Sequence, residues 1–177
     1  RQTINEANNL PLLLSDLSII QKEGEIIIVD CGSKDKTIDI ANIYGAKVYK
    51  SKEKNRGLQL DMGAKNSRGD WLIFLHADTR LTHDWFRKII SVLKGGTNNI
   101  YYFKFKINHK KIIFRFLEIL VNFRSYYFKQ PYGDQGLIIH RTTYFKNNGF
   151  RKIPLMEDVD FLRRLNKKKD LKQLNLP

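Results

Sequence analysis

Cysteine is nearly absent from the sequence, in which Cys31 is the single one among 177 residues. One thiol cannot form an internal disulfide, and it cannot supply a zinc site that uses several cysteines. The sequence also lacks a signal-peptide pattern at its start and any uninterrupted apolar run of the roughly 18 residues that a membrane-spanning helix needs. These absences favour a protein of a reducing compartment, such as the cytoplasm, that is not embedded in a membrane.

Acidic residues are few compared with basic ones. There are 18 Asp and Glu against 32 Lys and Arg, which gives a formal net charge of +14. Such an excess favours phosphate-bearing partners, namely nucleotides, nucleic acid or an anionic membrane face. The basic residues are spread along the chain except at residues 166–172, so we expect most of them to form a solvated surface. A nucleic-acid-binding domain is disfavoured, because helix-turn-helix, zinc and RNP-like patterns are missing.

Strands and helices alternate along the first half of the sequence. Residues 8–21 and 58–68 have the pattern of helices, a helix between them is capped by Ser33 or Asp35 and ends at Gly45, and residues 25–30, 46–50 and 71–76 have the pattern of strands. This alternation is typical of a parallel sheet with helices on its faces. Ligands of such sheets bind at the carboxyl ends of the strands, where Asp30 and Asp78 lie. No G-x-G-x-x-G follows a predicted strand, which speaks against a dehydrogenase.

The second half of the sequence is mixed. We expect a helix over residues 82–94, a strand that includes 101–107, an apolar helix within 111–129 and a final helix that begins near Glu157. The apolar helix allows two interpretations. It packs on the sheet as part of the core, which we prefer, or it lies on an anionic membrane and brings a lipid-linked acceptor to the site.

Five segments in this order form a recognisable set: "TINEANNL", "IIIVDCGSKDKT", "NRGLQLDMGAKNSRGDWLIFLHADTRL", "YGDQGLIIHR" and "IPLMEDVDFLRRL". Together they resemble the family 2 glycosyltransferases over nearly the whole chain, and "LHADTRL", "GDQG" and "LMEDV" look like a particular bacterial subgroup. The resemblance implies the α/β GT-A fold, with a mainly parallel, Rossmann-like sheet and helices on both faces. It also implies one domain over residues 1–177, with a nucleotide-binding half at about 1–80 and an acceptor-side half at about 81–177.

The resemblance also implies roles for single residues. Thr3 and Glu6 would lie near the donor nucleotide, and Asp30 falls on the first acidic position of the family's nucleotide-binding loop. Asp78 matches the last Asp of the metal-binding DxD signature, so it would bind Mn²⁺ or Mg²⁺ on the diphosphate. Asp158 matches the carboxylate that acts as general base on the acceptor hydroxyl.

Further residues are candidates for binding. Arg56 is placed to reach a phosphate, and Gly57 lets the backbone approach closely. The "GDQG" and "MED" segments resemble the acceptor side. The candidate acceptor contacts are Asp134, Gln135 and Glu157.

Two positions depart from the family pattern. Cys31 stands where many relatives have an Asp that reads the nucleotide base, and a thiol is a poorer hydrogen-bonding partner, so uridine specificity does not follow. His76 stands at the first Asp of DxD, where a neutral imidazole can ligate Mn²⁺, contact a phosphate or ribose, or simply end the strand.

The ends of the chain also differ from the family. The sequence begins at Arg1 and ends at Pro177, and both ends look cut. The family's first strand is expected to be missing, which would leave strand edges unpaired and an apolar strip open.

The function that these observations predict is inverting transfer of a sugar from a nucleotide-sugar donor to an unidentified glycan, lipid or small-molecule hydroxyl, assisted by a divalent metal. The expected location is cytoplasmic, with peripheral contact at the inner membrane face as an option. The alternatives are a truncated or inactive relative that binds nucleotide without transfer and, less favoured, a basic nucleic-acid-binding domain.

Overall fold

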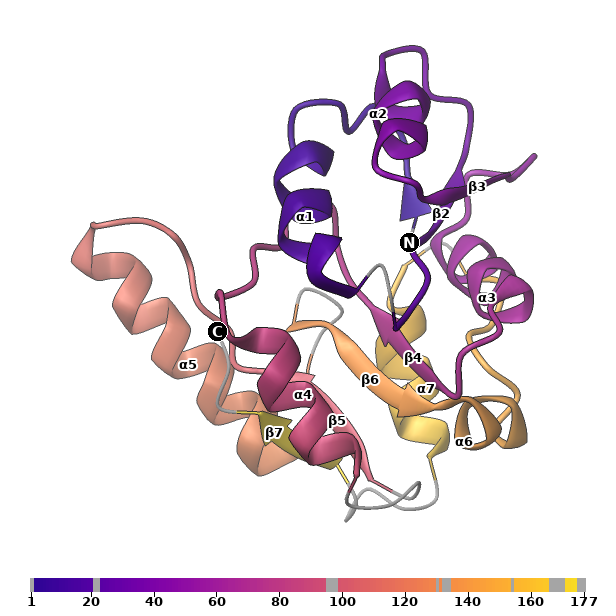
Figure 1. Cartoon of the computed structure of the whole chain (residues 1–177). Helices are drawn as coiled ribbons and strands as arrows, with labels where there is room; N and C mark the ends of the chain where they lie inside the picture. The colour runs from indigo at the N-terminus through magenta and orange to yellow at the C-terminus, as the bar shows by residue number, and fades with distance from the viewer. Residues whose placement is uncertain are drawn as a thin grey trace.

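The computed structural model describes residues 2–20, 23–94, 99–129, 131, 135–153, 155–165 and 171–174. Figure 1 shows the arrangement of its helices and strands. In chain order the elements are β1 (Gln2–Thr3), α1 (Leu10–Leu17) with a 3₁₀ turn (Ser18–Ile20), β2 (Ile27–Asp30), α2 (Thr37–Ile43), β3 (Lys47–Lys50), α3 (Arg56–Asn66), β4 (Trp71–Phe74), α4 (Trp85–Leu93), β5 (Ile100–Phe103), α5 (Ile112–Phe128), β6 (Leu137–His140), α6 (Arg141–Lys146), α7 (Glu157–Arg164) and β7 (Leu171–Leu174).

The first sheet is parallel and has the order β1-β2-β3. Its first strand has two residues, Gln2 and Thr3, which pair with Val29 and Asp30. The strand that we expected to be missing is therefore represented by a short one. As predicted, Asp35 binds the start of α2, since its Oδ1 accepts from the backbone N–H of Thr37 at 3.0 Å.

The second sheet has the order β4-β6-β5-β7 and is mixed. β4 pairs antiparallel with β6, so our expectation that residues 71–76 continue the parallel series was wrong in this respect. The alternation of strands and helices correctly predicted that β4 follows a helix. It could not reveal the neighbour of β4, because pairing depends on β6, which lies more than sixty residues further along the chain.

Helices cover both faces of the second sheet, as predicted. Successive side chains of a strand point to opposite faces, and β6 shows this clearly. Leu137 and Ile139 lie in a core cluster with α3, α6 and α7, whereas Ile138 lies in a second cluster with α1 and α4. A third cluster joins α1 and α2 to β2 in the first sheet.

Helix α5 has the bounds that the sequence predicts, but the preferred interpretation of it as a core helix was wrong. Among its described side chains only that of Ser125 is buried, and the large apolar ones are exposed. The helix lies at the edge of the molecule in Figure 1. Within the described part of the chain, no helix has the length and apolar character needed to cross a bilayer.

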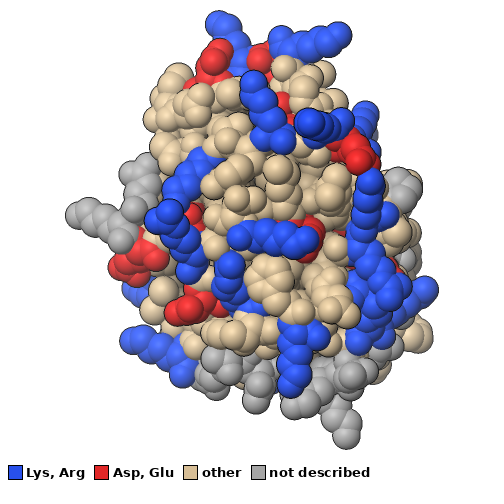
Figure 2. Space-filling view, turned by 90° about the vertical axis from the view of Figure 1, so that its right-hand side faces the viewer, with Lys and Arg blue, Asp and Glu red and all other residues tan. Residues whose placement is uncertain are grey.

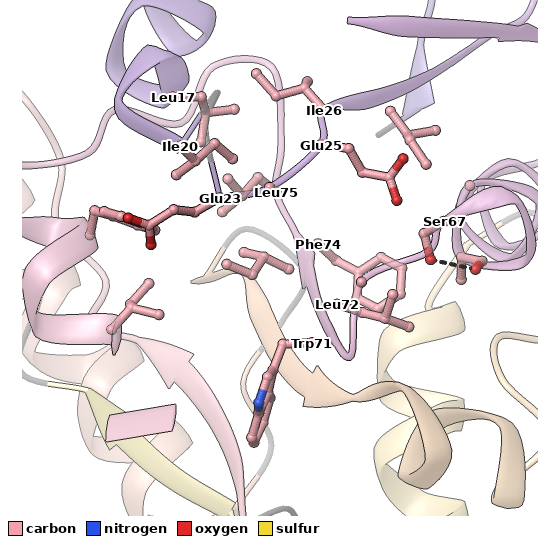
Figure 3. Close-up of a pocket in the computed structure, with 18 of the residues that line it drawn as sticks. Leu17, Ile20, Glu23, Glu25, Ile26, Ser67, Trp71, Leu72, Phe74 and Leu75 are labelled. Atoms are coloured by element: carbon pink, nitrogen blue, oxygen red, sulfur yellow. Dashed lines mark hydrogen bonds between the residues drawn. The ribbon is translucent and has the colours of Figure 1, made fainter. Parts of the chain in front are cut away.

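An apolar groove separates the two sheets. It has a volume of about 380 Å³, and residues of β2, β4, α1, α3 and α4 line it. Figure 3 shows Leu17, Ile20, Ile26, Leu75 and Trp71 around it. β2 and β4 lie in separate sheets as far as the described residues go.

Basic side chains are distributed widely over the surface. Figure 2 shows Lys and Arg spread over one whole face, with fewer Asp and Glu among them. This distribution agrees with the expectation that most of the excess charge forms a solvated surface.

Candidate active site

The loop after β2 is organised by Asp30, which is fully buried. Its carboxylate accepts hydrogen bonds from the hydroxyl of Thr3 at 3.2 Å, from the backbone N–H of Ser33 at 2.9 Å and from the hydroxyl of Ser33. Gly32 adopts a φ of 75°, which is a conformation that glycine reaches without a steric cost. Thr3 and Asp30, both predicted near the nucleotide, are thus brought together at the carboxyl ends of adjacent strands.

The loops after β1 and β2 are bonded to each other. The backbone N–H of Asn5 donates to Ser33 Oγ at 2.8 Å, and the Asn5 side chain accepts from the backbone N–H of Lys34 at 2.9 Å. The backbone N–H of Glu6 donates to Thr37 Oγ1 at 2.8 Å. Sequence reasoning missed Asn5 and considered Ser33 only as a helix cap, although an Asn before Glu6 and a Ser three residues after Asp30 are typical loop-forming positions.

A second pocket, of about 170 Å³, gathers half of the predicted site residues. Its polar lining consists of Glu6, Arg56, His76, Glu157 and Asp158, and its apolar lining includes residues of α3, β4 and β6. These five polar residues come from four distant parts of the chain. The structure therefore brings together, in one pocket at the carboxyl end of β4, residues predicted to bind the donor nucleotide, to bind its diphosphate and to act in catalysis.

Arg56 is the central cation of this pocket. Its Nε lies 2.6 Å from Glu157 Oε1, and its Nη2 contacts His76 Nε2. A guanidinium has no acceptor, so His76 must accept through an unprotonated Nε2. This contact occupies Nε2, so a metal bound through that nitrogen would have to displace Arg56.

Glu157, like Asp30, has no exposed surface. Burial raises the pKa of the Glu157 carboxyl above its usual range, and the positive charge of Arg56 opposes this rise. A carboxyl in this position serves to hold Arg56. A direct acceptor contact by Glu157 stays a prediction.

Gly57 allows the first turn of α3 to approach the residues before α7. A Cβ at this position would lie 2.0 Å from the carbonyl oxygen of Arg151 and 3.2 Å from the Cβ of Glu157. The close approach predicted for Gly57 therefore exists within the protein itself. It places Arg56, at the start of α3, against Glu157, at the start of α7.

Asp158 lies in the first turn of α7 and lines the pocket. It is 9% exposed, and its Oδ1 accepts from the backbone N–H of Val159 at 2.9 Å. Asp160, on the same turn, instead contacts Arg164 at 2.8 Å and Arg151 at 3.4 Å. Of these two aspartates, Asp158 is the one that lines the pocket.

Asp78 is exposed in the turn after β4, two residues beyond His76. The described residues contain no group of three or more His, Cys, Asp or Glu side chains that could hold a metal ion. A divalent cation at Asp78 would therefore take its other ligands from the diphosphate and water, which suits a hard cation that prefers oxygen ligands. Asp78 therefore fits a metal ion that binds together with the donor diphosphate better than one that the protein holds alone.

Of the predicted acceptor residues, Glu157 lines the pocket, whereas Gln135 does not. Gln135 is 2% exposed, accepts from Ser125 Oγ at 2.6 Å and donates to the carbonyl of Phe103 at 3.3 Å. These contacts join α5 to β5, and a sugar contact by Gln135 stays a prediction. Asp134 lies outside the described residues.

Chemically, the pocket combines one guanidinium, one imidazole that accepts from it, and the three carboxylates of Glu6, Glu157 and Asp158. The guanidinium suits a phosphate. A carboxylate that lines the pocket suits removal of a proton from a hydroxyl.

Proteins with similar sequences are named glycosyltransferases. A 4,4'-diaponeurosporenoate glycosyltransferase of Staphylococcus haemolyticus is 37% identical over 87 residues, which are 45% of this chain and 23% of that protein. A PGL/p-HBAD biosynthesis glycosyltransferase of Mycobacterium bovis is 36% identical over 87 residues, which are 45% of this chain and 34% of that protein. The chain thus spans about a quarter to a third of the length of these two relatives.

Solved structures share the fold. S. aureus TarS 1–349 has a TM-score of 0.77 at 19% identity, with 98% of this chain and 56% of that chain covered. Glucosyl-3-phosphoglycerate synthase of Mycobacterium tuberculosis, in complex with Mn²⁺, UDP and glucosyl-3-phosphoglycerate, has a TM-score of 0.71 at 17% identity and covers 99% of this chain and 67% of that chain. These neighbours confirm the predicted α/β GT-A fold.

The match to a family covers more of the chain than the match to either of the two sequence relatives. The sequence pattern of Glycosyl transferase family 2 covers residues 2–158, which include β1, the Asp30 loop, the pocket residues and Asp158. The chain belongs to glycosyltransferase family 2.

Proposed function

We propose that this chain is the catalytic domain of an inverting glycosyltransferase that moves a sugar from a nucleotide-sugar donor to an acceptor hydroxyl. The observation that carries the proposal is the single pocket lined by Glu6, Arg56, His76, Glu157 and Asp158. It lies at the carboxyl end of β4, and the loop that bears Glu6 is bonded to the Asp30 loop through Thr37 and Ser33.

The donor nucleotide would lie beside Thr3, Glu6 and Asp30, with its diphosphate directed toward Arg56. The bonded loops fix the backbone there before any ligand arrives, which reduces the ordering cost of binding. Structural neighbours were solved with UDP, so UDP-sugars are the first donors to test. Cys31 lies directly after Asp30, and we expect base selection to differ from relatives that have a second carboxylate there.

Asp78 is the residue that would hold Mn²⁺ or Mg²⁺ on the diphosphate. The cation, when bound, neutralises charge on the leaving nucleoside diphosphate. Arg56 adds a fixed positive charge on the pocket side. Because Glu157 and His76 hold the guanidinium from two directions, its orientation does not depend on the ligand.

Asp158 would take the proton of the acceptor hydroxyl as its oxygen attacks the anomeric carbon. The new bond forms on the face opposite to the leaving diphosphate, so the configuration inverts. The backbone N–H of Val159 donates to Asp158 Oδ1 and orients the carboxylate. Acceptors to be tested include glycans, lipids and small molecules.

The test compares Asp158→Asn with Asp160→Asn, which changes a carboxylate on the same turn of α7. We expect Asp158→Asn to lower nucleoside diphosphate release from UDP-sugars, in the presence of acceptor mixtures, by about 10²- to 10⁴-fold. Binding of UDP, measured by calorimetry, should stay nearly unchanged. Asp160→Asn should keep most of the activity, because Asp160 contacts Arg164 and Arg151 on the outside of the pocket.

Unchanged release by Asp158→Asn would refute its role as the base. Nucleotide binding by the wild-type chain without any release, over all donors and acceptors, would instead favour the alternative function of nucleotide binding without transfer.

A further inference from the structure

Helix α5 presents its apolar side chains to the outside of the protein. Ten large apolar side chains of this helix are between 43% and 85% exposed. They are Ile112, Ile113, Phe116, Leu117, Ile119, Leu120, Phe123, Tyr126, Tyr127 and Phe128. Monomeric proteins rarely expose so many large apolar groups on one element unless a partner covers them.

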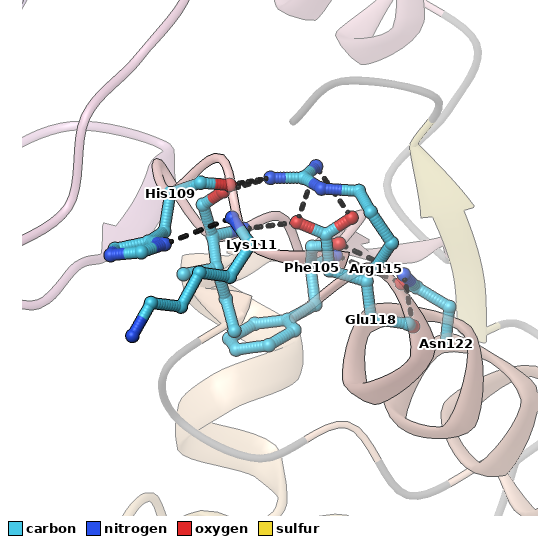
Figure 4. A network of polar contacts seen from close by, with 7 residues as sticks. Phe105, His109, Lys111, Arg115, Glu118 and Asn122 are labelled. Atoms are coloured by element: carbon cyan, nitrogen blue, oxygen red, sulfur yellow. Dashed lines mark hydrogen bonds and ion pairs between the residues drawn. The ribbon is translucent and has the colours of Figure 1, made fainter. Parts of the chain in front are cut away.

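The inner side of α5 is polar instead. The Asn122 side chain donates to the carbonyl of Phe105 at 2.8 Å and accepts from the backbone N–H of Phe105 at 2.9 Å. Glu118 accepts from the backbone N–H of Ile107 at 2.6 Å, and Arg115 donates to the carbonyl of Ile107 at 2.7 Å. Figure 4 shows this network between α5 and residues 105–111.

These contacts fix the direction in which the helix faces. Arg115 also pairs with Glu118 at 2.8 Å, and Ser125 binds the buried Gln135 at 2.6 Å. A rotation of α5 that buried its apolar side would break its bonds to Phe105, Ile107 and Gln135 and leave buried polar groups unpaired, which is costly. The apolar side is therefore held outward by the fold.

Basic residues lie at both ends of this helix. Lys129 follows the helix. Four exposed lysines precede it, namely Lys104, Lys106, Lys110 and Lys111. Glu118 is the only acidic residue between positions 99 and 129, and Arg115 neutralises it. An apolar helix with a cationic border has the composition of helices that lie in the interface of an anionic bilayer.

We propose that α5 and residues 104–111 form a surface that docks on an anionic lipid bilayer, with the apolar side chains of α5 inserted at the level of the headgroups. At 17 residues, the helix is too short and too cationic at its ends to span the bilayer, so it lies parallel to it. Aromatic residues at one end, Tyr126 and Tyr127, suit the boundary between headgroups and acyl chains.

A second copy of the chain is a poorer occupant of this surface. In a symmetric dimer the same patch meets itself. A parallel or an antiparallel pairing of α5 would bring the lysines at its ends against lysines or Arg124 of the other copy, with no acidic residue to balance them. Anionic headgroups supply that balance.

The experiment measures co-sedimentation of the whole chain with vesicles of phosphatidylcholine alone or of equal parts phosphatidylcholine and phosphatidylglycerol. The test variant is Phe116→Ser/Leu120→Ser/Phe123→Ser on α5. The matched control is Leu12→Ser/Ile19→Ser/Ile43→Ser, which changes three other exposed apolar side chains on α1, its 3₁₀ turn and α2. All of these positions are exposed, so both variants should keep the wild-type melting temperature.

We expect the wild type to bind the phosphatidylglycerol vesicles, and the α5 variant to bind them about tenfold or more weakly. The control should bind like the wild type. Lys110→Glu/Lys111→Glu should weaken binding to the anionic vesicles, and added salt should do the same. Neither vesicle assay depends on donor binding or transfer, so the proposed catalytic function and this proposal can fail separately.

Light scattering on the same samples detects dimers, in which a second copy of the chain would cover the apolar side of α5. A dimer that the α5 substitutions dissociate, together with no vesicle binding, would overturn the lipid proposal in favour of a second copy. A monomer that binds neither type of vesicle, or equal binding by the α5 variant and the wild type, would overturn it as well.

Discussion

Single residues of the pocket differ in how far the sequence predicted them. The sequence singled out Arg56, His76 and Asp158, and all three line the same pocket. The contact of Arg56 with His76 and Glu157 was not predictable, because it requires the start of α7 to pack against the start of α3. That packing depends on a backbone approach at Gly57, and the sequence does not reveal its partner, the Arg151 carbonyl.

Glu157 leads to a prediction about pH. Because burial raises its pKa, the folded protein keeps a proton on this carboxyl above the pH at which the unfolded chain, with a usual value near 4.5, has lost it. Between these two pKa values the folded state binds more protons, so the free energy of unfolding falls as pH rises through this window. The contribution is about 1.4 kcal/mol for each unit of pKa difference.

The measurement is urea unfolding of the wild type and of Glu157→Gln from pH 4 upward to about pH 8. The variant should lack the part of the decline that Glu157 causes, since an amide does not titrate. Glu53→Gln serves as the control, because Glu53 is an exposed carboxylate paired with Lys152. An identical pH dependence in Glu157→Gln and the wild type would show that its pKa is not raised.

At the scale of elements, helix α3 leads to a second stability prediction. Gly57→Ala places a methyl group 2.0 Å from the Arg151 carbonyl, a backbone atom that cannot move aside easily. We expect the free energy of unfolding to fall by about 1–3 kcal/mol, and UDP binding to weaken because Arg56 shifts. Gly69→Ala is the control, since its added Cβ would lie at 3.5 Å from the nearest atom.

Thermal melts and calorimetric titrations of both glycine variants check this prediction. Equal stability of Gly57→Ala and Gly69→Ala would mean that α3 and α7 separate without cost. In that case the close approach at Gly57 would not be what positions Arg56.

Helix α5 shows what sequence periodicity can and cannot predict at this scale. The bounds of the helix were predicted well, because a long apolar pattern with helical spacing is a strong signal. The side on which the apolar residues lie was predicted wrongly. A broad apolar face occurs in core helices and in surface helices alike, and the deciding residues were polar ones, Glu118, Asn122 and Ser125, whose partners at residues 105–107 and Gln135 are known only from the structure.

At the scale of the whole molecule, two sheets are joined by helices α1 and α3 and separated by an apolar groove. The sequence predicted the class of fold from the alternation of its elements, but not the antiparallel pairing of β4 with β6. The carboxyl end of β4 nevertheless faces the loops of the first sheet, since Glu6 from one sheet and His76 from the other line one pocket. The donor site thus depends on both sheets.

The charge of the whole molecule fits more than one anionic partner. A net charge of +14 attracts nucleotides and membranes without selecting between them. Specific binding must therefore be measured at the pocket, with a variant that leaves the overall charge distribution nearly unchanged.

The most direct test of the account is a calorimetric titration of the folded chain with UDP, GDP and dTDP, with and without Mn²⁺. The variants are Asp78→Ala, at the carboxyl end of β4, and Asp70→Ala, an exposed carboxylate at the opposite end of the same strand. We predict Mn²⁺-dependent binding of one nucleotide, which Asp78→Ala weakens about tenfold or more and Asp70→Ala preserves. A folded chain that binds none of the three nucleotides, or binds one regardless of Mn²⁺ and Asp78, would contradict the proposed donor site.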